Sequence, residues 1–282
     1  MKIITTIKEI RAALNQEKKS GKTIGFVPTM GYFHEGHLSL MRKAKENCDV
    51  VVTSIFVNPI QFGPSEDFET YPRNLKNDSK MAEEVGVDYL FLPSVEEMYS
   101  GECLAYVDVE KITKVLCGAN RPGHFRGVAT IVSKLFNIIQ PDFVYFGEKD
   151  YQQLVAIKKM VDDLNFDIQV VGVPIVREKD GLAMSSRNKF LGLREREAAL
   201  VLNKSLNLAS EMVKNGEKDS IVIKKAMKRL IKKEPLVNLE YLSICDNIYL
   251  QELSKIEENV LIALAARVGK ARLIDNVLIE GN

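Results

Sequence analysis

Two histidines, His34 and His37, stand three residues apart in the segment Pro28–His37, together with two glycines. Neutral imidazoles can donate hydrogen bonds to phosphate oxygens without carrying a fixed charge. Gly31 and Gly36 would let the backbone approach a ligand closely. These residue types predict a nucleotide-phosphate site. The same two imidazoles would also suit zinc if a third ligand joined them, and their spacing alone leaves both chemistries open.

Two later strings carry further groups that suit a nucleotide. In Gly147–Asp150, the ammonium group of Lys149 can neutralise phosphate charge, and Asp150 can cap a helix or accept hydrogen bonds from ribose hydroxyls. The string Ala183–Arg187 brings two serine hydroxyls and a guanidinium into one loop. Each string alone is also compatible with a surface turn or a helix cap. Three such strings in this order are far less probable by chance than any one of them.

The elements that must position these groups alternate in the first part of the chain. Apolar runs that end at turn formers indicate buried strands at residues 23–27, 48–57, 87–92, 143–146 and 168–173. Helix-like spacing is found at residues 38–44, 74–85, 126–139 and 151–164. This order predicts an α/β fold with a mostly parallel, Rossmann-like sheet and helices on both faces. The polar strings would then lie on one rim, at the carboxyl ends of the strands.

The pattern changes after about Val176. Residues 193–233 have helical spacing with no strand between them, and residues 239–244, 260–266 and 271–278 indicate short strands. We therefore predict two domains, a Rossmann-like domain over residues 1–176 and a smaller C-terminal α+β domain over residues 177–282.

Composition narrows the class of protein. The net charge of the 282 residues is +1 with no long basic run, so no nucleic-acid partner is expected. No stretch holds the roughly 18 uncharged apolar residues that a membrane span needs, so we expect no membrane association and a cytoplasmic location. The four cysteines are scattered without a CxxC pair, which indicates neither a disulfide framework nor a zinc ribbon.

The histidine segment carries a family resemblance. The spacing of Met, Gly, His, Gly and His over residues 30–37 resembles the HxGH motif of the adenylyl-transferring superfamily, which includes class I aminoacyl-tRNA synthetases and small-molecule nucleotidyltransferases. Residues 183–187 resemble the mobile KMSKS-type loop of that superfamily, with Arg187 where the loop often has Lys. The full string of residues 28–37 is similar to the pantothenate synthetase family, and the further strings that share this similarity are residues 56–63, 71–73, 118–128 and 146–154.

That resemblance implies an AMP-forming carboxylate–amine ligase of coenzyme A precursor biosynthesis. Pantoate would attack the α-phosphate of ATP to give pantoyl adenylate and pyrophosphate. The amine of β-alanine would then form pantothenate and release AMP. The resemblance also implies Mg²⁺ as the ion that bridges phosphate oxygens, and a homodimer.

The resemblance assigns roles residue by residue. The implied catalytic residues are His34, His37, Lys149 and Arg187. The implied ATP contacts are these four with Met30, Gly31, Gly36, Gly147, Asp150, Val176, Met184, Ser185 and Ser186. The implied contacts for pantoate and β-alanine are Gln61, Gln153 and Met30, and the implied magnesium contact is Asp78. Neutral amides suit pantoate because a cationic anchor would overstabilise the carboxylate that must attack.

Three other functions stay open on the sequence. A nucleotidyltransferase that keeps AMP on its product would share the histidine segment but would need no second amine substrate. A class I aminoacyl-tRNA synthetase would need a tRNA-binding module, for which residues 177–282 offer little support. A non-catalytic nucleotide sensor would bind ATP without turnover.

Overall fold

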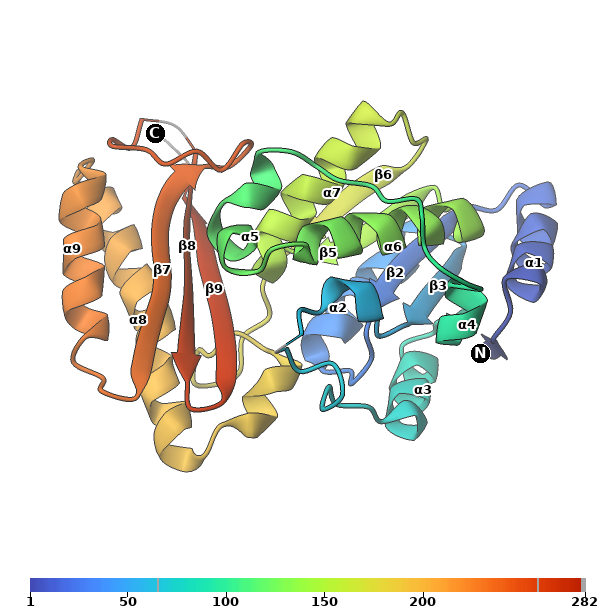
Figure 1. Ribbon diagram of the computed structural model, residues 1–282, viewed down its shortest axis with the longest axis horizontal. Coiled ribbons are helices and arrows are strands. Elements are labelled where there is room, and N and C mark those ends of the chain that lie inside the picture. The colour runs from blue at the N-terminus through green and yellow to red at the C-terminus, as the bar shows by residue number, and fades with distance from the viewer. Residues whose placement is uncertain (65, 258, 280–282) are drawn as a thin grey trace.

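The first part of the chain folds around a six-stranded parallel sheet (Figure 1). This computed structural model describes residues 1–64, 66–257 and 259–279. The strand order is β1-β4-β3-β2-β5-β6, and every neighbouring pair is parallel. The strands are β1 (Lys2–Ile4), β2 (Ile24–Thr29), β3 (Val50–Ile55), β4 (Tyr89–Phe91), β5 (Phe143–Gly147) and β6 (Gln169–Val173). The predicted Rossmann-like α/β fold is confirmed, with β1 as a short strand that the sequence pattern did not indicate.

The order in which strands are added reverses between β2 and β5. The chain adds β3 and β4 on one side of β2, and β5 and β6 on the other. In open α/β sheets, ligands bind at the carboxyl ends of the strands at such a switch point. The histidine segment follows β2 and the Lys149 turn follows β5, so these two strings are neighbours in space although they are far apart in the sequence.

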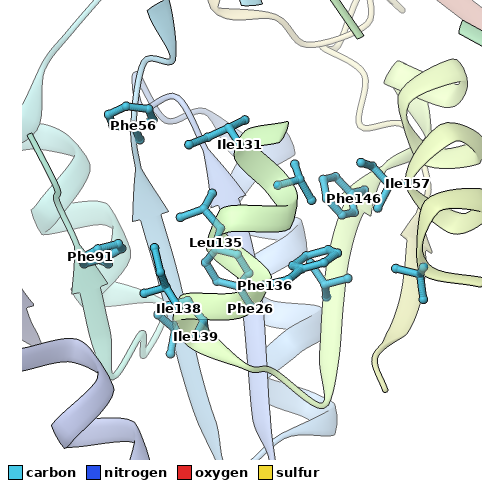
Figure 2. Close-up of a cluster of buried hydrophobic side chains, with 14 of the residues drawn as sticks. Phe26, Phe56, Phe91, Ile131, Leu135, Phe136, Ile138, Ile139, Phe146 and Ile157 are labelled. Atoms are coloured by element: carbon cyan, nitrogen blue, oxygen red, sulfur yellow. The ribbon is translucent and has the colours of Figure 1, made fainter. Parts of the chain in front are cut away.

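Helices cover both faces of this sheet. They are α1 (Ile7–Lys19), α2 (Glu35–Asn47), α3 (Leu75–Glu84), α4 (Val95–Met98), α5 (Leu116–Asn120), α6 (His124–Ile139) and α7 (Tyr151–Asp163). Phe26 of β2 packs with α1, α6 and α7, whereas the next residue, Val27, packs with α2 and α3. This follows from the alternation of side chains along a strand. Figure 2 shows Phe26, Phe136 and Phe146 in the first of these clusters.

The C-terminal part builds a second core. Helices α8 (Leu193–Lys214) and α9 (Ser220–Ile231) pack on one face of an antiparallel sheet of order β7-β8-β9 (Figure 1). Its strands are β7 (Val237–Asp246), β8 (Val260–Val268) and β9 (Ala271–Ile279). On the opposite face, Leu261 and Ala263 of β8 meet Val155 and Ala156 of α7. The predicted α+β content is confirmed, and no helix of the described chain is long and apolar enough to cross a bilayer.

Candidate active site

A cavity of about 990 Å³ opens at the switch point between β2 and β5. Its wall includes His34 and His37 after β2, Lys149 after β5, and Arg272 and Asn276 of β9. The cavity therefore lies between the parallel sheet and the antiparallel sheet. Its volume is that of a site for a small molecule or cofactor.

Most of the residues expected from the sequence line this cavity. They are Met30, His34, Gly36, His37, Gln61, Gly147, Lys149, Asp150, Gln153, Val176, Met184, Ser185, Ser186 and Arg187. Gly31 and Asp78 are not part of the described lining. The fold thus brings the three polar strings and both glutamines to one place.

His34 caps the N-terminus of α2 with its ring. Its Nδ1 accepts a hydrogen bond from the backbone N–H of Gly36 at 3.1 Å, and Nδ1 of His37 accepts one from the N–H of His34 at 3.3 Å. The centroids of the two rings lie 4.1 Å apart. Because Nδ1 is the acceptor in both rings, each neutral imidazole carries its proton on Nε2. Both rings are therefore donors through Nε2–H.

Both imidazoles are neutral at physiological pH. Burial, with a smaller contribution from the charge of Lys149, lowers the pKa of His34 to about 4. Burial, followed by the charges of His34 and Lys149, lowers the pKa of His37 well below its usual value of 6.5. The two rings can therefore donate to phosphate oxygens without acting as fixed cations.

Asp78 of α3 holds the histidine segment from behind the cavity wall. The residue is 1% exposed, and its carboxylate oxygens accept hydrogen bonds from the N–H groups of Tyr32 at 2.8 Å and Phe33 at 2.7 Å. Gly31 has a φ of 83°, and a Cβ there would lie 2.9 Å from Cγ2 of Ile55, so only glycine fits. Asp78 and Gly31 thus both shape the histidine segment, and the ligand contacts that the family resemblance implies for them stay predictions.

Metal binding by the protein alone finds little support. The described residues contain no cluster of three or more His, Cys, Asp or Glu side chains that could hold a metal ion. Among the described residues, the zinc alternative for His34 and His37 therefore has no third ligand, and each carboxylate oxygen of Asp78 accepts a hydrogen bond from a backbone N–H. Mg²⁺ commonly keeps several waters and binds through substrate phosphates.

The turn after β5 presents the ammonium group of Lys149. The side-chain amide of Asn276 donates to the carbonyl oxygens of Glu148 and Lys149, at 2.9 Å each, and so joins β9 to this turn. Lys149 forms an ion pair with no carboxylate of the described residues. An ammonium group without a counter-ion, beside two imidazole N–H donors, makes a site for an anion.

The third string meets the loop that follows β3. Arg187 donates to both carboxylate oxygens of Asp67, at 3.0 and 2.8 Å. The hydroxyl groups of Ser186 and Tyr71 lie 3.4 Å apart. Oγ of Ser185 accepts a hydrogen bond from the N–H of Arg187 at 3.2 Å. Ser185 is thus a cap for the turn at Ser186–Phe190, and it lines the cavity as well.

The two glutamines expected to bind substrate are held differently. Gln61 is 8% exposed; its amide oxygen accepts a hydrogen bond from Nδ2 of Asn58 at 3.2 Å, and its amide nitrogen lies 3.0 Å from the sulfur of Met30. Gln153, on the first turn of α7, is half-buried, and its amide bonds to no described residue. The side-chain amide of its neighbour Gln152 forms hydrogen bonds with backbone groups of residues 112, 115 and 117. Of the neighbours Gln152 and Gln153, only Gln153 has a side-chain amide that is available to a ligand among the described residues.

Sequence reasoning gave no role to several residues of the cavity wall. They are Arg121 and His124 near the start of α6, Tyr241, Arg267, Arg272 and Asn276 of the antiparallel sheet, and Lys270 in the turn between β8 and β9. A signal for the last group existed, because Arg272, Ile274 and Asn276 alternate along a predicted strand and share one face. The sequence did not reveal what that face would meet.

The chain matches a known family over nearly its whole length. The family model described as pantoate-beta-alanine ligase matches residues 2–278. The pantothenate synthetase of Caldicellulosiruptor bescii is 55% identical over 280 residues, which cover 99% of this chain and 99% of that protein. The pantothenate synthetase of Heliobacterium modesticaldum is 55% identical over 280 residues, which cover 99% of this chain and 100% of that protein.

Solved structures agree with these relatives. Pantothenate synthetase from Thermus thermophilus superposes with a TM-score of 0.94 at 46% identity, covering 98% of this chain and 99% of that one. Pantoate-beta-alanine ligase from Francisella tularensis, complexed with beta-gamma ATP and beta-alanine, has a TM-score of 0.81 at 36% identity, covering 99% of this chain and 97% of that one. Together with the parallel sheet and the histidine segment at its switch point, these matches show that the chain belongs to the pantoate–β-alanine ligase family, the pantothenate synthetases.

Proposed function

We propose that this chain is an ATP-dependent ligase that condenses pantoate with β-alanine to form pantothenate, through a pantoyl adenylate intermediate. The observation that carries this proposal is the convergence of the histidine segment, the Lys149 turn and residues 184–187 on one cavity with Gln61 and Gln153. The relative from Francisella tularensis is complexed with beta-gamma ATP and beta-alanine, which correspond to two of the three substrates of this reaction.

In the first half-reaction, a carboxylate oxygen of pantoate attacks the α-phosphorus of ATP and pyrophosphate leaves. The carboxylate is itself the nucleophile, so the protein has to align the reactants and stabilise the charge that develops on the phosphate oxygens. His34 and His37 donate their Nε2–H groups to those oxygens, and Lys149 adds a positive charge beside them.

Pantoate is held by neutral groups. The amides of Gln61 and Gln153 donate to a carboxylate or hydroxyl oxygen and accept from a hydroxyl. Met30 and Phe56 supply apolar contacts for the gem-dimethyl group of pantoate. Neutral amides leave the carboxylate its nucleophilicity, which a cationic anchor would reduce.

The nucleotide occupies the rest of the cavity. The further residues assigned to ATP contact are Gly36, Gly147, Asp150, Val176, Met184, Ser185 and Ser186. Arg187 joins the triphosphate once it exchanges the carboxylate of Asp67 for a phosphate. Mg²⁺ bound with ATP would supply further positive charge at the phosphate oxygens.

In the second half-reaction, the neutral amine of β-alanine attacks the acyl carbon of pantoyl adenylate. The bond between that carbon and the phosphate oxygen breaks, AMP leaves with the electron pair, and the nitrogen loses a proton as the amide forms. AMP is a far better leaving group than the oxide that direct condensation would expel, which is why the first half-reaction is needed.

We further propose that residues 1–176 form the domain that binds ATP and pantoate, and that residues 177–282 act as a lid over it. The contact between Asn276 and the Lys149 turn supports this division, because it places β9 against the phosphate site. From the composition of the chain we propose a cytoplasmic location without nucleic-acid or membrane partners, and from the family resemblance alone we propose a homodimer.

The test is pyrophosphate release in the absence of β-alanine. Purified protein with ATP, Mg²⁺ and pantoate should release pyrophosphate, and labelled pyrophosphate should exchange into ATP only when pantoate is present. β-Alanine should then release AMP and pantothenate in equal amounts. Exchange that ignores pantoate, or ADP as the product, would refute the ligase. AMP retained on the product would identify a nucleotidyltransferase, and ATP binding without turnover would identify a sensor.

A further inference from the structure

The third histidine of the chain lies directly against Gln61. Nδ1 of His124, the first residue of α6, is 2.8 Å from the backbone carbonyl oxygen of Gln61. Nε2 of the same ring is 2.9 Å from Nη1 of Arg121. His124 and Arg121 both line the cavity, so this contact is part of the site rather than of a remote surface.

The two neighbours of His124 leave one possible protonation state. A carbonyl oxygen can only accept, so Nδ1 must carry a proton and donate it to Gln61. A guanidinium can only donate, so Nε2 must accept from Arg121. The ring is therefore neutral. In agreement, burial and the charge of Arg121 lower the pKa of His124 to about 4.

Arg121 is itself fixed in place. Its Nε and Nη2 donate to the two carboxylate oxygens of Glu66, at 2.7 and 2.6 Å. This bidentate pair is largely buried, with 17% of the Arg121 side chain and 22% of the Glu66 side chain exposed. A paired guanidinium of this kind has little freedom to turn. His124 is thus held on one side by a rigid donor and holds Gln61 on the other.

The backbone of α6 also touches the turn that carries Gln61. A Cβ on Gly127 would lie 2.5 Å from the carbonyl oxygen of Ile60 and 2.6 Å from Cα of Gln61, so only glycine permits this approach. The carbonyl oxygen of Gly127 accepts a hydrogen bond from Nδ2 of Asn58 at 3.1 Å, and the same Nδ2 donates to the amide oxygen of Gln61 at 3.2 Å. Helix α6 therefore fixes both the backbone and the side chain of Gln61.

We infer that the first turn of α6 is a positioning platform for Gln61, and that His124 is a positioning residue that sets the affinity for pantoate by acting through Gln61. The inference rests on the proposed role of Gln61 as a pantoate contact. Its physical basis is that a side-chain amide recognises a ligand only if the backbone that carries it is held still, since displacements of about 1 Å at a binding group are costly.

Three substitutions of His124 separate the parts of this contact. In His124→Asn the amide nitrogen takes the place of Nδ1 and can still donate to Gln61. In His124→Gln the amide nitrogen takes the place of Nε2, and in His124→Leu no donor is left, so both lose the bond. We expect the last two to raise the KM for pantoate about tenfold, as for one lost hydrogen bond, with the KM for ATP changed by less than about twofold. His124→Asn should stay within about threefold of the wild type for both substrates.

Two companion variants complete the set. Gly127→Ala pushes the turn of Gln61 by a different route and should raise the KM for pantoate in the same selective way. Arg126→Gln is the matched control, because Arg126 is exposed on the same helical turn and contacts Tyr106 outside the cavity lining. That variant should leave the KM for pantoate unchanged. Thermal melts of all variants report whether each one folds.

A double-mutant cycle with Gln61→Ala decides between positioning and an independent effect. If His124 acts through Gln61, His124→Leu should change the KM for pantoate by less than about twofold once Gln61 is already Ala. Additive effects would overturn the inference, and so would a normal KM for pantoate in His124→Gln or equal losses for Asn and Gln at position 124. If Gln61→Ala itself leaves the KM for pantoate unchanged, the proposed substrate role of Gln61 fails instead, and the two failures are thereby told apart.

Discussion

His34 has two separable roles in this structure, and one pair of substitutions can separate them. Its Nδ1 caps α2 by accepting from the N–H of Gly36 at 3.1 Å, and its Nε2–H is left as a donor in the cavity. In His34→Asn the amide oxygen can replace Nδ1 as the cap, because asparagine is among the best N-cap residues, but nothing reaches the position of Nε2. In His34→Gln the amide reaches the position of Nε2 and the cap is lost.

The magnitudes of the two losses are distinct. Removing an N-cap costs about 0.5–2 kcal/mol of stability. Removing a donor that stabilises transition-state charge costs about 10²–10³ in rate, or about 2.7–4 kcal/mol of activation free energy. His34→Asn should therefore keep its free energy of unfolding within about 0.5 kcal/mol of the wild type and lose at least about 10² in adenylation rate. His34→Gln should lose about 1 kcal/mol of stability and retain more of the rate.

The assay is single-turnover pyrophosphate release from ATP and pantoate without β-alanine, which isolates the step in which the phosphate charge develops. Urea denaturation of the same samples gives the free energy of unfolding. A normal adenylation rate in His34→Asn, with stability intact, would show that the imidazole is only a helix cap. If the adenylation rate fell in proportion to the free energy of unfolding in both variants, the two roles would not be separate.

Two further predictions concern stability. The protein should lose stability as the pH falls from about 6.5 towards about 4, because burial lowers the pKa of His34 and of His124 to about 4 while histidines of the unfolded chain titrate near 6.5. The unfolded state binds more protons in that pH range, so the free energy of unfolding should fall by up to about 1.4 kcal/mol per pH unit for each histidine. Urea denaturation at several pH values in this range measures the change. A free energy of unfolding that does not vary with pH would contradict the neutral, buried rings. Asn276→Leu should leave the carbonyl oxygens of Glu148 and Lys149 without their donor, at a cost of about 1–3 kcal/mol, and should raise the KM for ATP more than the KM for pantoate. An unchanged KM for ATP would show that β9 does not shape the phosphate site.

The βα order and the rim of polar strings could be predicted because each strand is an apolar run that ends at a turn former. Helix N-termini and polar loops must then meet at the carboxyl edge of the sheet. The pairing of β2 with β5 could not be predicted in the same way, because strand order depends on packing across the whole sheet. β1 was not predicted, because three residues are too few to show a hydrophobic periodicity.

Asp78 has contacts in the structure that could not be predicted from the sequence. The family resemblance implies that Asp78 contacts magnesium. In the structure Asp78 is 1% exposed, and each of its carboxylate oxygens accepts a hydrogen bond from a backbone N–H, of Tyr32 or of Phe33. The sequence shows that a carboxylate is present. The packing of α3 behind the histidine segment determines which groups donate hydrogen bonds to it.

The three histidines illustrate how local backbone geometry chooses the chemistry of a side chain. At the start of α2, unpaired N–H groups of the helix end donate to Nδ1 of His34 and His37, and this forces the proton onto Nε2. At the start of α6, a carbonyl oxygen of the neighbouring turn accepts from Nδ1 of His124, and this forces the opposite tautomer. All three rings are neutral because burial beside Lys149 or Arg121 disfavours a second cation. The first two are thereby donors at the cavity wall, whereas both ring nitrogens of the third already bond to Arg121 and Gln61, so we expect His124 to act on the site through Gln61.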